Sequence, residues 1–135
     1  MAEKSAFIFV CDLATESECL TKELMGGTQA SAVWALNIRP SDSIYLFNFN
    51  TRVIRGPYTA VSSADCHDTS AWCGKFPVQV KVARSSLTKV ADSHLPGAPA
   101  ALLRKRPPHV LGAHTASELL SWIQAVGQAE AVEGQ

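Results

Sequence analysis

The sequence has no long apolar run. Its two most apolar short segments, FIFV at 7–10 and IYLF at 44–47, are each four residues long. A membrane-spanning helix needs about 20 apolar residues, and a secretory signal needs an apolar stretch of about 7–15. We therefore expect no membrane span and no secretory signal, and we expect the protein to act in the cytoplasm, the nucleus or both.

Closely spaced cysteine pairs are also missing. The four cysteines form two loose pairs, Cys11 with Cys19 and Cys66 with Cys73, with seven and six residues between the partners. Structural zinc sites typically leave about two to four residues between paired ligands. In a reducing compartment cysteine behaves as a small, often buried apolar residue, so we expect free thiols and no metal ion.

Catalytic and nucleotide-binding motifs are absent as well. One polar loop, at 62–70, does collect chemically active residue types: Asp65, Cys66, His67, Asp68 and Ser70. Neighbouring residues in one loop are not a preorganised triad, and no oxyanion-hole motif accompanies them. The glycine pair at 26–27 lacks the lysine and the spacing of a phosphate-binding loop. We predict a protein with no catalytic residue and no cofactor.

Net charge is zero, but its distribution is uneven. Residues 1–38 hold two lysines against five acidic residues (net −3), residues 39–106 hold ten basic against four acidic (net +6), and three glutamates follow. The basic centre permits an anionic partner, while the zero total argues against indiscriminate nucleic-acid binding. The triplet RKR at 104–106 fits either a nuclear-import or phosphate-binding patch or a flexible basic linker.

Length and composition fit one domain. The chain has 135 residues, of which 47% are hydrophobic and 18% charged, enough for one core and too few for two. We interpret residues 1–135 as a single domain. It has a core at 6–90, an extended connection at 91–114, a C-terminal helix at 115–127 and a frayed tail at 128–135.

The first third predicts a strand and a helix. Residues 6–10 (AFIFV) are apolar without a break, which is typical of a central strand buried on both faces. Thr15 and Glu18 have the spacing of a capping box, so we predict a helix from there to about residue 25, ended by the glycine pair at 26–27. Residues 30–36 (ASAVWAL) fit either a strand or a loop edge.

An aromatic hairpin is predicted in the middle of the chain. Residues 44–50 alternate, with Tyr45, Phe47 and Phe49 on the face that we assign to the core. The return strand carries a bulge or bend at Gly56-Pro57. After the polar loop comes the cleanest alternation, at 76–82, with an apolar inner face and three outward polar residues on a wet, basic face: Lys75, Gln79 and Lys81.

The last third predicts one more helix. Residues 85–111 are rich in proline, alanine, histidine and arginine, and we interpret them as mostly extended, with a short helical turn at 100–104. Thr115 and Glu118 have capping-box spacing, and an apolar stripe follows: Leu119, Leu120, Ile123 and Val126. Trp122, in the same helix, is assigned to packing.

Four segments resemble, in order, the Development and Cell Death (DCD) domain over roughly residues 6–90. They are FIF at 7–9, LFNF at 46–49, GPYTA at 56–60 and GKFPVQV at 74–80. The family's usual Phe-Gly-Leu-Pro after the first helix is replaced here by LMGG at 24–27. The resemblance implies a protein-interaction module in stress or programmed cell-death signalling.

A looser similarity connects the chain to YTH and EVE domains, which share a PUA-like barrel that reads modified bases. Val33-Trp34-Ala35 resembles the motif that carries one cage tryptophan of YTH domains, and Trp72 stands where another precedes a G-x-F strand. The resemblance implies an α+β, PUA-like small mixed β-barrel with flanking helices and a C-terminal helix. It also implies that Trp34 and Trp72 approach each other across the barrel mouth.

Binding candidates follow from this comparison. A base stacked on an aromatic ring gains about 1–3 kcal/mol, although each tryptophan equally fits a plug at an end of the barrel. Asp12, after the first strand, and Asn37, which closes VWALN, are the polar candidates beside Trp34 and Trp72. Four basic residues either steer a phosphate backbone or form a solvated face: Lys75, Lys81, Arg52 and Arg55.

Two functions therefore remain open. The first is recognition of RNA, or of DNA carrying a modified base, through an aromatic pocket. The second is interaction with other proteins. We expect the first, because an aromatic pair lies beside basic strand residues.

Overall fold

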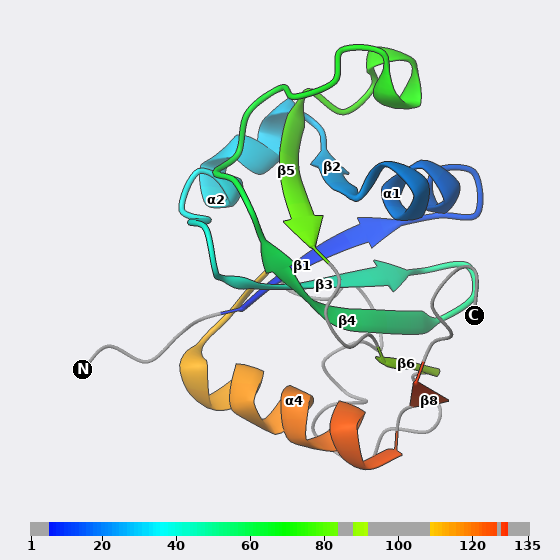
Figure 1. The fold of residues 1–135 in the computed structure, drawn as a ribbon, viewed down its shortest axis with the longest axis vertical. Helices are drawn as coiled ribbons and strands as arrows, with labels where there is room; N and C mark the ends of the chain where they lie inside the picture. The colour runs from blue at the N-terminus through cyan, green and yellow to red at the C-terminus, as the bar shows by residue number, and fades with distance from the viewer. Residues whose placement is uncertain (1–5, 84–87, 92–108, 127, 130–135) are drawn as a thin grey trace.

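The computed structural model describes residues 6–83, 88–91, 109–126 and 128–129. Within these residues, eight strands form one mixed sheet with helices on both sides. The main path of the sheet runs β2-β5-β4-β3-β1-β7, and β6 and β8 extend it from β4. In Figure 1, β5 and β2 rise above the plane of β1, β3 and β4, so that the sheet curls over a core. The predicted α+β class is confirmed.

The centre of the sheet is a parallel strand pair. β1 (Ala6–Cys11) runs parallel to β3 (Ser43–Asn48), and β7 (Val110–Leu111) pairs antiparallel on its other side. Ala6 to Phe9 are all buried, which an uninterrupted apolar run predicts for a strand covered on both faces. The central position of this strand is confirmed.

The predicted hairpin forms between β3 and β4 (Val53–Ala60). Its register shifts between Ile44 and Leu46, opposite the cis peptide bond of Gly56-Pro57, so the expected kink is present. Gly56 has a φ of 143°, and a Cβ there would lie 2.7 Å from the Tyr45 ring. Only glycine fits this position without a shift of the ring.

The outer strands complete the curl. β4 pairs with β5 (Val78–Ala83), which pairs with β2 (Leu24–Gly27). The amino-terminal half of β4 pairs with β6 (Thr88–Ala91), and β6 pairs with β8 (Gln128–Ala129). Residues 128–129 were predicted to fray, and this part of the prediction is wrong because they add a strand to the edge.

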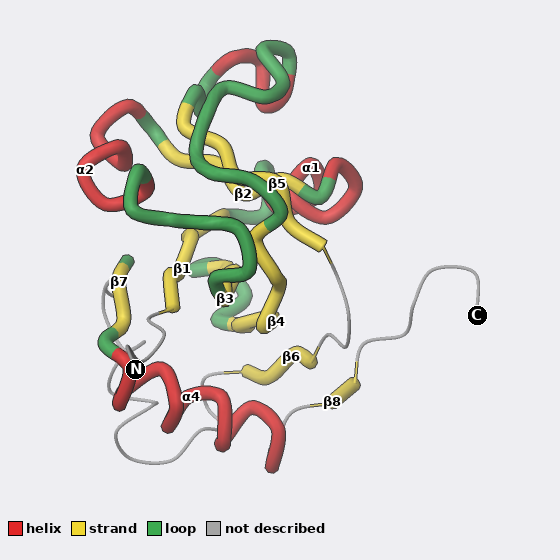
Figure 2. The backbone as a smooth tube through the Cα atoms, turned by 60° about the vertical axis from the view of Figure 1, so that its left-hand side comes forward, coloured by secondary structure: helices red, strands yellow, loops and turns green. Residues whose placement is uncertain are grey.

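Two apolar cores lie on opposite faces of the sheet. The larger is enclosed by the curled sheet, and Phe7, Phe9 and Trp72 are among its residues. The smaller contains Tyr45 and Phe47 together with residues of α4 (Ala113–Val126), which lies below the sheet in Figures 1 and 2. Of the predicted hairpin rings, Phe49 is 49% exposed, so its assignment to the core is wrong. It follows the end of β3, where the alternation no longer applies.

The first helix, α1 (Glu16–Lys22), is shorter than predicted and is capped differently. Thr15 makes no side-chain cap, and its hydroxyl donates to the Asp12 carboxylate at 3.0 Å. That carboxylate also accepts the backbone N–H groups of Ala14 and Thr15, both at 2.9 Å. The capping-box prediction is wrong because the acidic residue three positions upstream is the stronger acceptor.

The helix also ends before the glycine pair. Glu23 takes the left-handed conformation, with a φ of 53°, and its N–H bonds to the Cys19 carbonyl. The next four residues are β2, so Gly26 and Gly27 lie in a strand and not at a helix end. The glycines are needed for packing: a Cβ on Gly26 would lie 2.7 Å from the Trp72 ring, and one on Gly27 would lie 2.4 Å from the Ser31 hydroxyl.

The ambiguous segment at 30–36 is helical. A 3-10 turn, η1 (Gln29–Ser31), leads into the short helix α2 (Ala32–Ala35). Both alternatives weighed from the sequence, strand and loop edge, are wrong. Three alanines lie in this segment, at positions 30, 32 and 35, and alanine favours helix over strand.

The strand predicted at 76–82 begins two residues later. Val78, Val80 and Val82 are buried as expected, and Lys81 is exposed. Gln79, however, is 1% exposed, so its assignment to the wet face is wrong. Strand β5 is buried on both sides at this point because the loop before it folds back over Gln79.

The C-terminal helix begins at Ala113, so Thr115 lies inside it and the second capping box is also wrong. Leu119 and Ile123 are buried as predicted. Trp122 is 39% exposed, in contrast to the expected packing role. The predicted helical turn at 100–104 and the triplet at 104–106 lie outside the described residues. No described helix is long and apolar enough to cross a membrane.

Candidate functional site

Trp34 projects from α2 onto the amino-terminal half of β1. Its ring packs edge-on against Phe9 at 4.9 Å and lies roughly parallel to Phe7 at 6.4 Å. The side chain is half-buried, whereas Val33 in the same short helix and Leu36 at its C-cap are 86% and 69% exposed. The helix therefore carries a large flat ring at the surface of the enclosed core.

The ring of His109 covers a face of Trp34. The two ring centroids are 4.6 Å apart and the planes differ by only 4°. His109 is the residue before β7, and the near end of β7 points toward α2 in Figure 2. Its Nδ1 lies 3.2 Å from the Ile8 carbonyl oxygen, and the Ile8 N–H donates to the His109 carbonyl at 2.8 Å.

Trp72 lies in a different setting. It is 5% exposed, its indole N–H donates to the Thr15 carbonyl at 3.0 Å, and its backbone N–H donates to the Glu18 carboxylate at 2.8 Å. The glutamate that was expected to close a capping box thus fixes the tryptophan loop to α1. Trp72 and Cys73 both have positive φ, 50° and 54°, a conformation that costs about 1–3 kcal/mol per residue and persists only where contacts enforce it.

The two tryptophan rings contact different residues of the enclosed core. The Trp72 ring covers Gly26, whereas the next residue, Gly27, borders Ser31 and Phe9. Phe9 in turn contacts Trp34. Both rings pack on the enclosed core, and no ring contact between them occurs within the part of the chain that is described. An aromatic cage formed by facing tryptophans remains a prediction.

Gln79 organises the loop that carries Trp72. Its side-chain oxygen accepts the backbone N–H groups of His67 and Asp68, at 2.9 and 2.8 Å. Its side-chain nitrogen donates to the carbonyls of Asp68 and Phe76, both at 2.9 Å. One buried amide therefore satisfies four backbone groups and closes the loop on β5.

The polar residues of this loop have structural partners. Asp68 accepts both the N–H and the hydroxyl of Ser70 and pairs with Lys22 at 3.0 Å, and these contacts hold the pKa of its carboxyl below the usual range. His67 lies 3.0 Å from the Ser62 hydroxyl, which also donates to the Ser63 carbonyl. The arrangement stabilises the loop, and no group of three or more metal-ligating side chains occurs in the described parts of the chain.

The Asp12 carboxylate already accepts hydrogen bonds from the turn that leads into α1. Its bond from the Thr15 hydroxyl is the main cause of its lowered pKa, and the Thr15 and Ala14 N–H groups and the charge of Lys75 add to the effect. The structure thus brings Asp12 near Lys75. Asn37, in contrast, is exposed beside Trp34, whose carbonyl accepts the Asn37 N–H at 3.1 Å.

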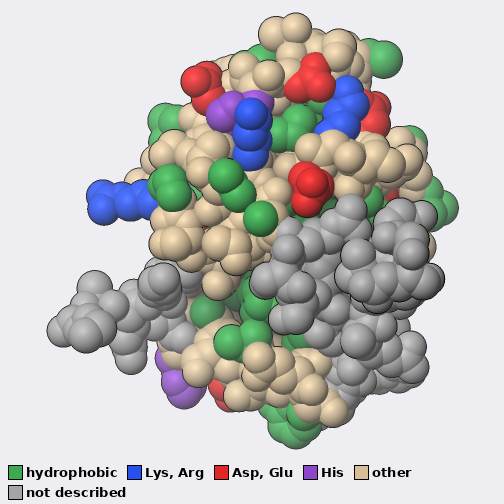
Figure 3. Space-filling view, in the orientation of Figure 1, with side chains coloured by type: hydrophobic (Ala, Val, Ile, Leu, Met, Phe, Trp, Pro, Cys, Tyr) green, Lys and Arg blue, Asp and Glu red, His purple; other side chains and the backbone are tan. Residues whose placement is uncertain are grey.

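The four predicted basic residues do not form one surface. Arg55 makes an ion pair with Glu16, and both side chains are largely buried. Arg52 lies over the Phe47 ring at 4.9 Å. Lys75 and Lys81 are exposed. On the face drawn in Figure 3, basic side chains are scattered among acidic ones and do not gather into a patch.

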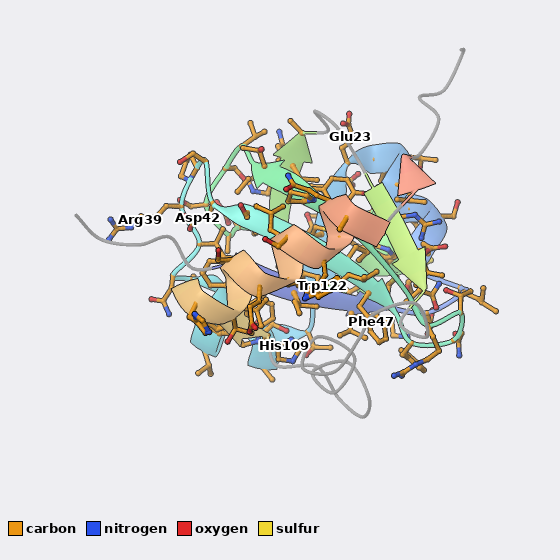
Figure 4. The ribbon with its side chains drawn as sticks, turned by 90° about the horizontal axis from the view of Figure 1, so that it is seen from below. Glu23, Arg39, Asp42, Phe47, His109 and Trp122 are labelled. Carbon is orange, nitrogen blue, oxygen red and sulfur yellow. The ribbon has the colours of Figure 1, made fainter. Side chains whose placement is uncertain are left out.

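Sequence reasoning missed His109 and Arg39. His109 is far from Trp34 in sequence, and nothing in HVLG marks it as a ring partner. Arg39 is exposed close after Asn37, and its backbone N–H donates to the Asp42 carboxylate at 2.8 Å. Figure 4 shows Arg39 at the edge of the molecule, away from Trp122 on α4. Asn37 and Arg39 are thus two exposed polar residues that follow Trp34 closely in the sequence.

Solved structures of low sequence identity share the fold. The structure of a YTH domain-containing protein, mmi1, in an RNA complex has a TM-score of 0.64 at 13% identity, covering 90% of this chain and 82% of that one. A crystal structure of the Mmi1 YTH domain gives 0.65 at 14%, covering 92% and 90%. The NMR structure of Rpa0253 from Rhodopseudomonas palustris gives 0.59 at 16%, covering 92% and 96%. The predicted PUA-like fold is confirmed.

The sequence itself indicates the family. No curated protein matches it. The family model described as the development and cell death domain matches residues 5–93, which is most of the chain. The four segments FIF, LFNF, GPYTA and GKFPVQV all lie inside the matched range. The chain therefore belongs to the development and cell death domain family.

Proposed function

We propose that this protein binds single-stranded RNA without catalysing a reaction, and that Trp34 is the ring on which a base stacks. The observation that supports this most directly is the half-buried Trp34, held at the surface by Phe7 and Phe9 and already parallel to another aromatic ring. Sequence-specific RNA binding relies on unpaired bases stacked on rigid aromatic side chains. Two neighbours that share the fold are YTH domains in complex with RNA.

Trp72 has a supporting role in this proposal. Its ring is buried and its indole N–H already has an acceptor in Thr15. A stacked base would need the strained loop at 72–74 to open and the contact with Glu18 to break. Trp34 needs no comparable rearrangement of the backbone.

Charge supports a modest, salt-dependent affinity. Among the residues that the structure describes, the exposed basic side chains available to a phosphate backbone include Lys75, Lys81 and Arg39. For single strands, log K falls with log salt by about 0.7 per phosphate contact, so up to three contacts give a slope of about −2. A much steeper slope needs a larger basic surface than these residues provide.

The test is a titration of fluorescently labelled single-stranded RNA, followed by anisotropy at low salt. Plain and base-modified RNA, and the matching DNA, are compared. The variant Trp34→Leu keeps apolar bulk against Phe9 but removes the flat ring. We expect it to bind at least about fivefold more weakly, the equivalent of one stacked base.

The matched control is Trp122→Leu, because Trp122 is also partly exposed but lies on α4, across the sheet. It is expected to bind like the wild type. Absence of saturable binding to every oligonucleotide would refute the proposed function. Equal losses in the two variants would show that Trp34 is not the stacking ring.

A second candidate function is supported by two exposed apolar residues, Val33 in α2 and Leu36 at its C-cap. Val33 and Leu36 are three positions apart, so they lie on one side of the helix, and both are largely exposed. Exposed apolar residues in a group are typical of protein-binding surfaces. In this case, partners recovered with the protein from cells remain after nuclease treatment and are lost in a double Val33→Ser, Leu36→Ser variant.

A further inference from the structure

His109 covers the same kind of surface that a stacked base needs. Its imidazole is a flat five-membered nitrogen heterocycle, and it lies parallel to the Trp34 indole at 4.6 Å with a 4° difference in plane. Offset-stacked aromatic pairs in proteins have centroids about 4.5–7 Å apart, so the two rings are in full contact. A base cannot occupy that face of the indole while the imidazole is there.

The position of His109 is held mainly by the backbone. The Ile8 N–H donates to the His109 carbonyl at 2.8 Å, and β7 pairs with β1 immediately afterwards. The side chain adds a longer contact, from Nδ1 to the Ile8 carbonyl oxygen at 3.2 Å. The imidazole can therefore rotate away from Trp34 without breaking the strand pairing.

That rotation would leave two features for a ligand. The Trp34 face becomes available for stacking, and the Ile8 carbonyl oxygen becomes available to a donor at the edge of the ring. A base with an N–H group on its edge meets both requirements, as the imidazole itself does. The side chain thus imitates one ring of a purine bound at the same place.

We infer that His109 occupies the base-stacking face of Trp34 in the free protein and is displaced when RNA binds. The inference rests on the proposed function, because it assigns a regulatory contact to the same site. The stack lowers the affinity of the protein for RNA, since the base must first replace an internal partner. Any change that removes the imidazole raises the affinity.

Three variants test this by the same RNA titration. His109→Ala removes the competing ring, and removal of one stacked pair is expected to tighten binding by about three- to tenfold. His109→Phe keeps a ring on Trp34, so its affinity should stay at or below that of the wild type. His114→Ala is the matched control, because His114 is a histidine whose side chain is 90% exposed on α4. Unchanged or weaker binding by His109→Ala refutes the inference, as does equal tightening by His109→Phe.

Proton NMR of the His109 ring gives an independent readout that does not depend on a variant. In the free protein, the indole ring current shifts the carbon-bound imidazole protons away from their ordinary positions. Saturating single-stranded RNA should return them toward those positions. Unmoved imidazole protons in protein that has bound RNA contradict displacement while leaving the proposed function intact. If no RNA binds to wild type or to His109→Ala, the proposed function fails, and this inference fails with it.

Discussion

Gln79→Leu tests how the tryptophan loop is held. The side-chain amide of Gln79 makes four hydrogen bonds of 2.8–2.9 Å with backbone groups of residues 67, 68 and 76, and it is 1% exposed. At about 1 kcal/mol per bond these contribute about 4 kcal/mol, and the added apolar burial of leucine offsets about 1 kcal/mol. We expect the free energy of unfolding to fall by about 3 kcal/mol.

The measurement is equilibrium unfolding in urea. The dependence of the unfolding free energy on urea concentration should be the same in the variant and the wild type, which shows that the folded state is unchanged. Gln124→Leu is the matched control, because Gln124 is an exposed glutamine on α4, and it should change stability by no more than about 0.5 kcal/mol. If Gln79→Leu loses less than about 1 kcal/mol, the four bonds do not hold the loop, and the reasoning about Trp72 falls with them.

Three further predictions concern the helix cap and the thiols. Asp12→Ala should lower the free energy of unfolding by about 1 kcal/mol in urea, as loss of a helix cap does, and a loss within experimental error would contradict the cap. Folding lowers the pKa of the Asp12 carboxyl, so the stability that this carboxylate adds is present above its unfolded pKa of about 4 and is lost as the pH falls below that value. Asp12→Asn should therefore flatten this part of the plot of unfolding free energy against pH. An unchanged plot would contradict a role of the carboxylate in stability. Burial raises the pKa of the Cys19 thiol to about 12 and also raises the pKa of the Cys11 thiol. A thiol reagent should therefore label only the exposed Cys66 and Cys73 in the folded protein. Four fast-reacting thiols would contradict the burial of Cys11 and Cys19.

Regular elements with strong periodicity were predictable from the sequence. The unbroken apolar run at the start of β1 predicts its burial on both faces, and the alternation in β3 predicts that Tyr45 and Phe47 share one core. The kink at Gly56-Pro57 also follows from residue type, because neither residue suits a regular strand. These features depend on neighbours in sequence, which the sequence displays directly.

Errors arose where a distant contact overrode a local preference. The Thr15 to Glu18 capping box is a good local motif, yet Asp12 takes the cap and Glu18 bonds to the Trp72 backbone instead. The alternation along β5 places Gln79 on the outward face, yet the preceding loop folds over it. In both cases a partner that local sequence cannot reveal satisfies the polar group.

The candidate site was predicted in part for the same reason. Trp34 was identified through a motif, but its ring partner His109 comes from the other end of the chain, and the pairing depends on the register of β7 against β1. The contact between the Trp72 ring and Gly26 depends on β2, a segment that was predicted to be the end of a helix. An error in one short element therefore hid this contact from the sequence-based prediction.

We expect Trp34, and not Trp72 or Trp122, to receive the base. The chain has three tryptophans, so a nitrogen-15 NMR spectrum of the folded protein contains three indole N–H signals, which single Trp→Phe variants assign. Titration with single-stranded RNA should shift the Trp34 signal in a saturable way and leave those of Trp72 and Trp122 in place. A saturable shift of the Trp72 or Trp122 signal with Trp34 unmoved, or no shift of any signal, would contradict the claim.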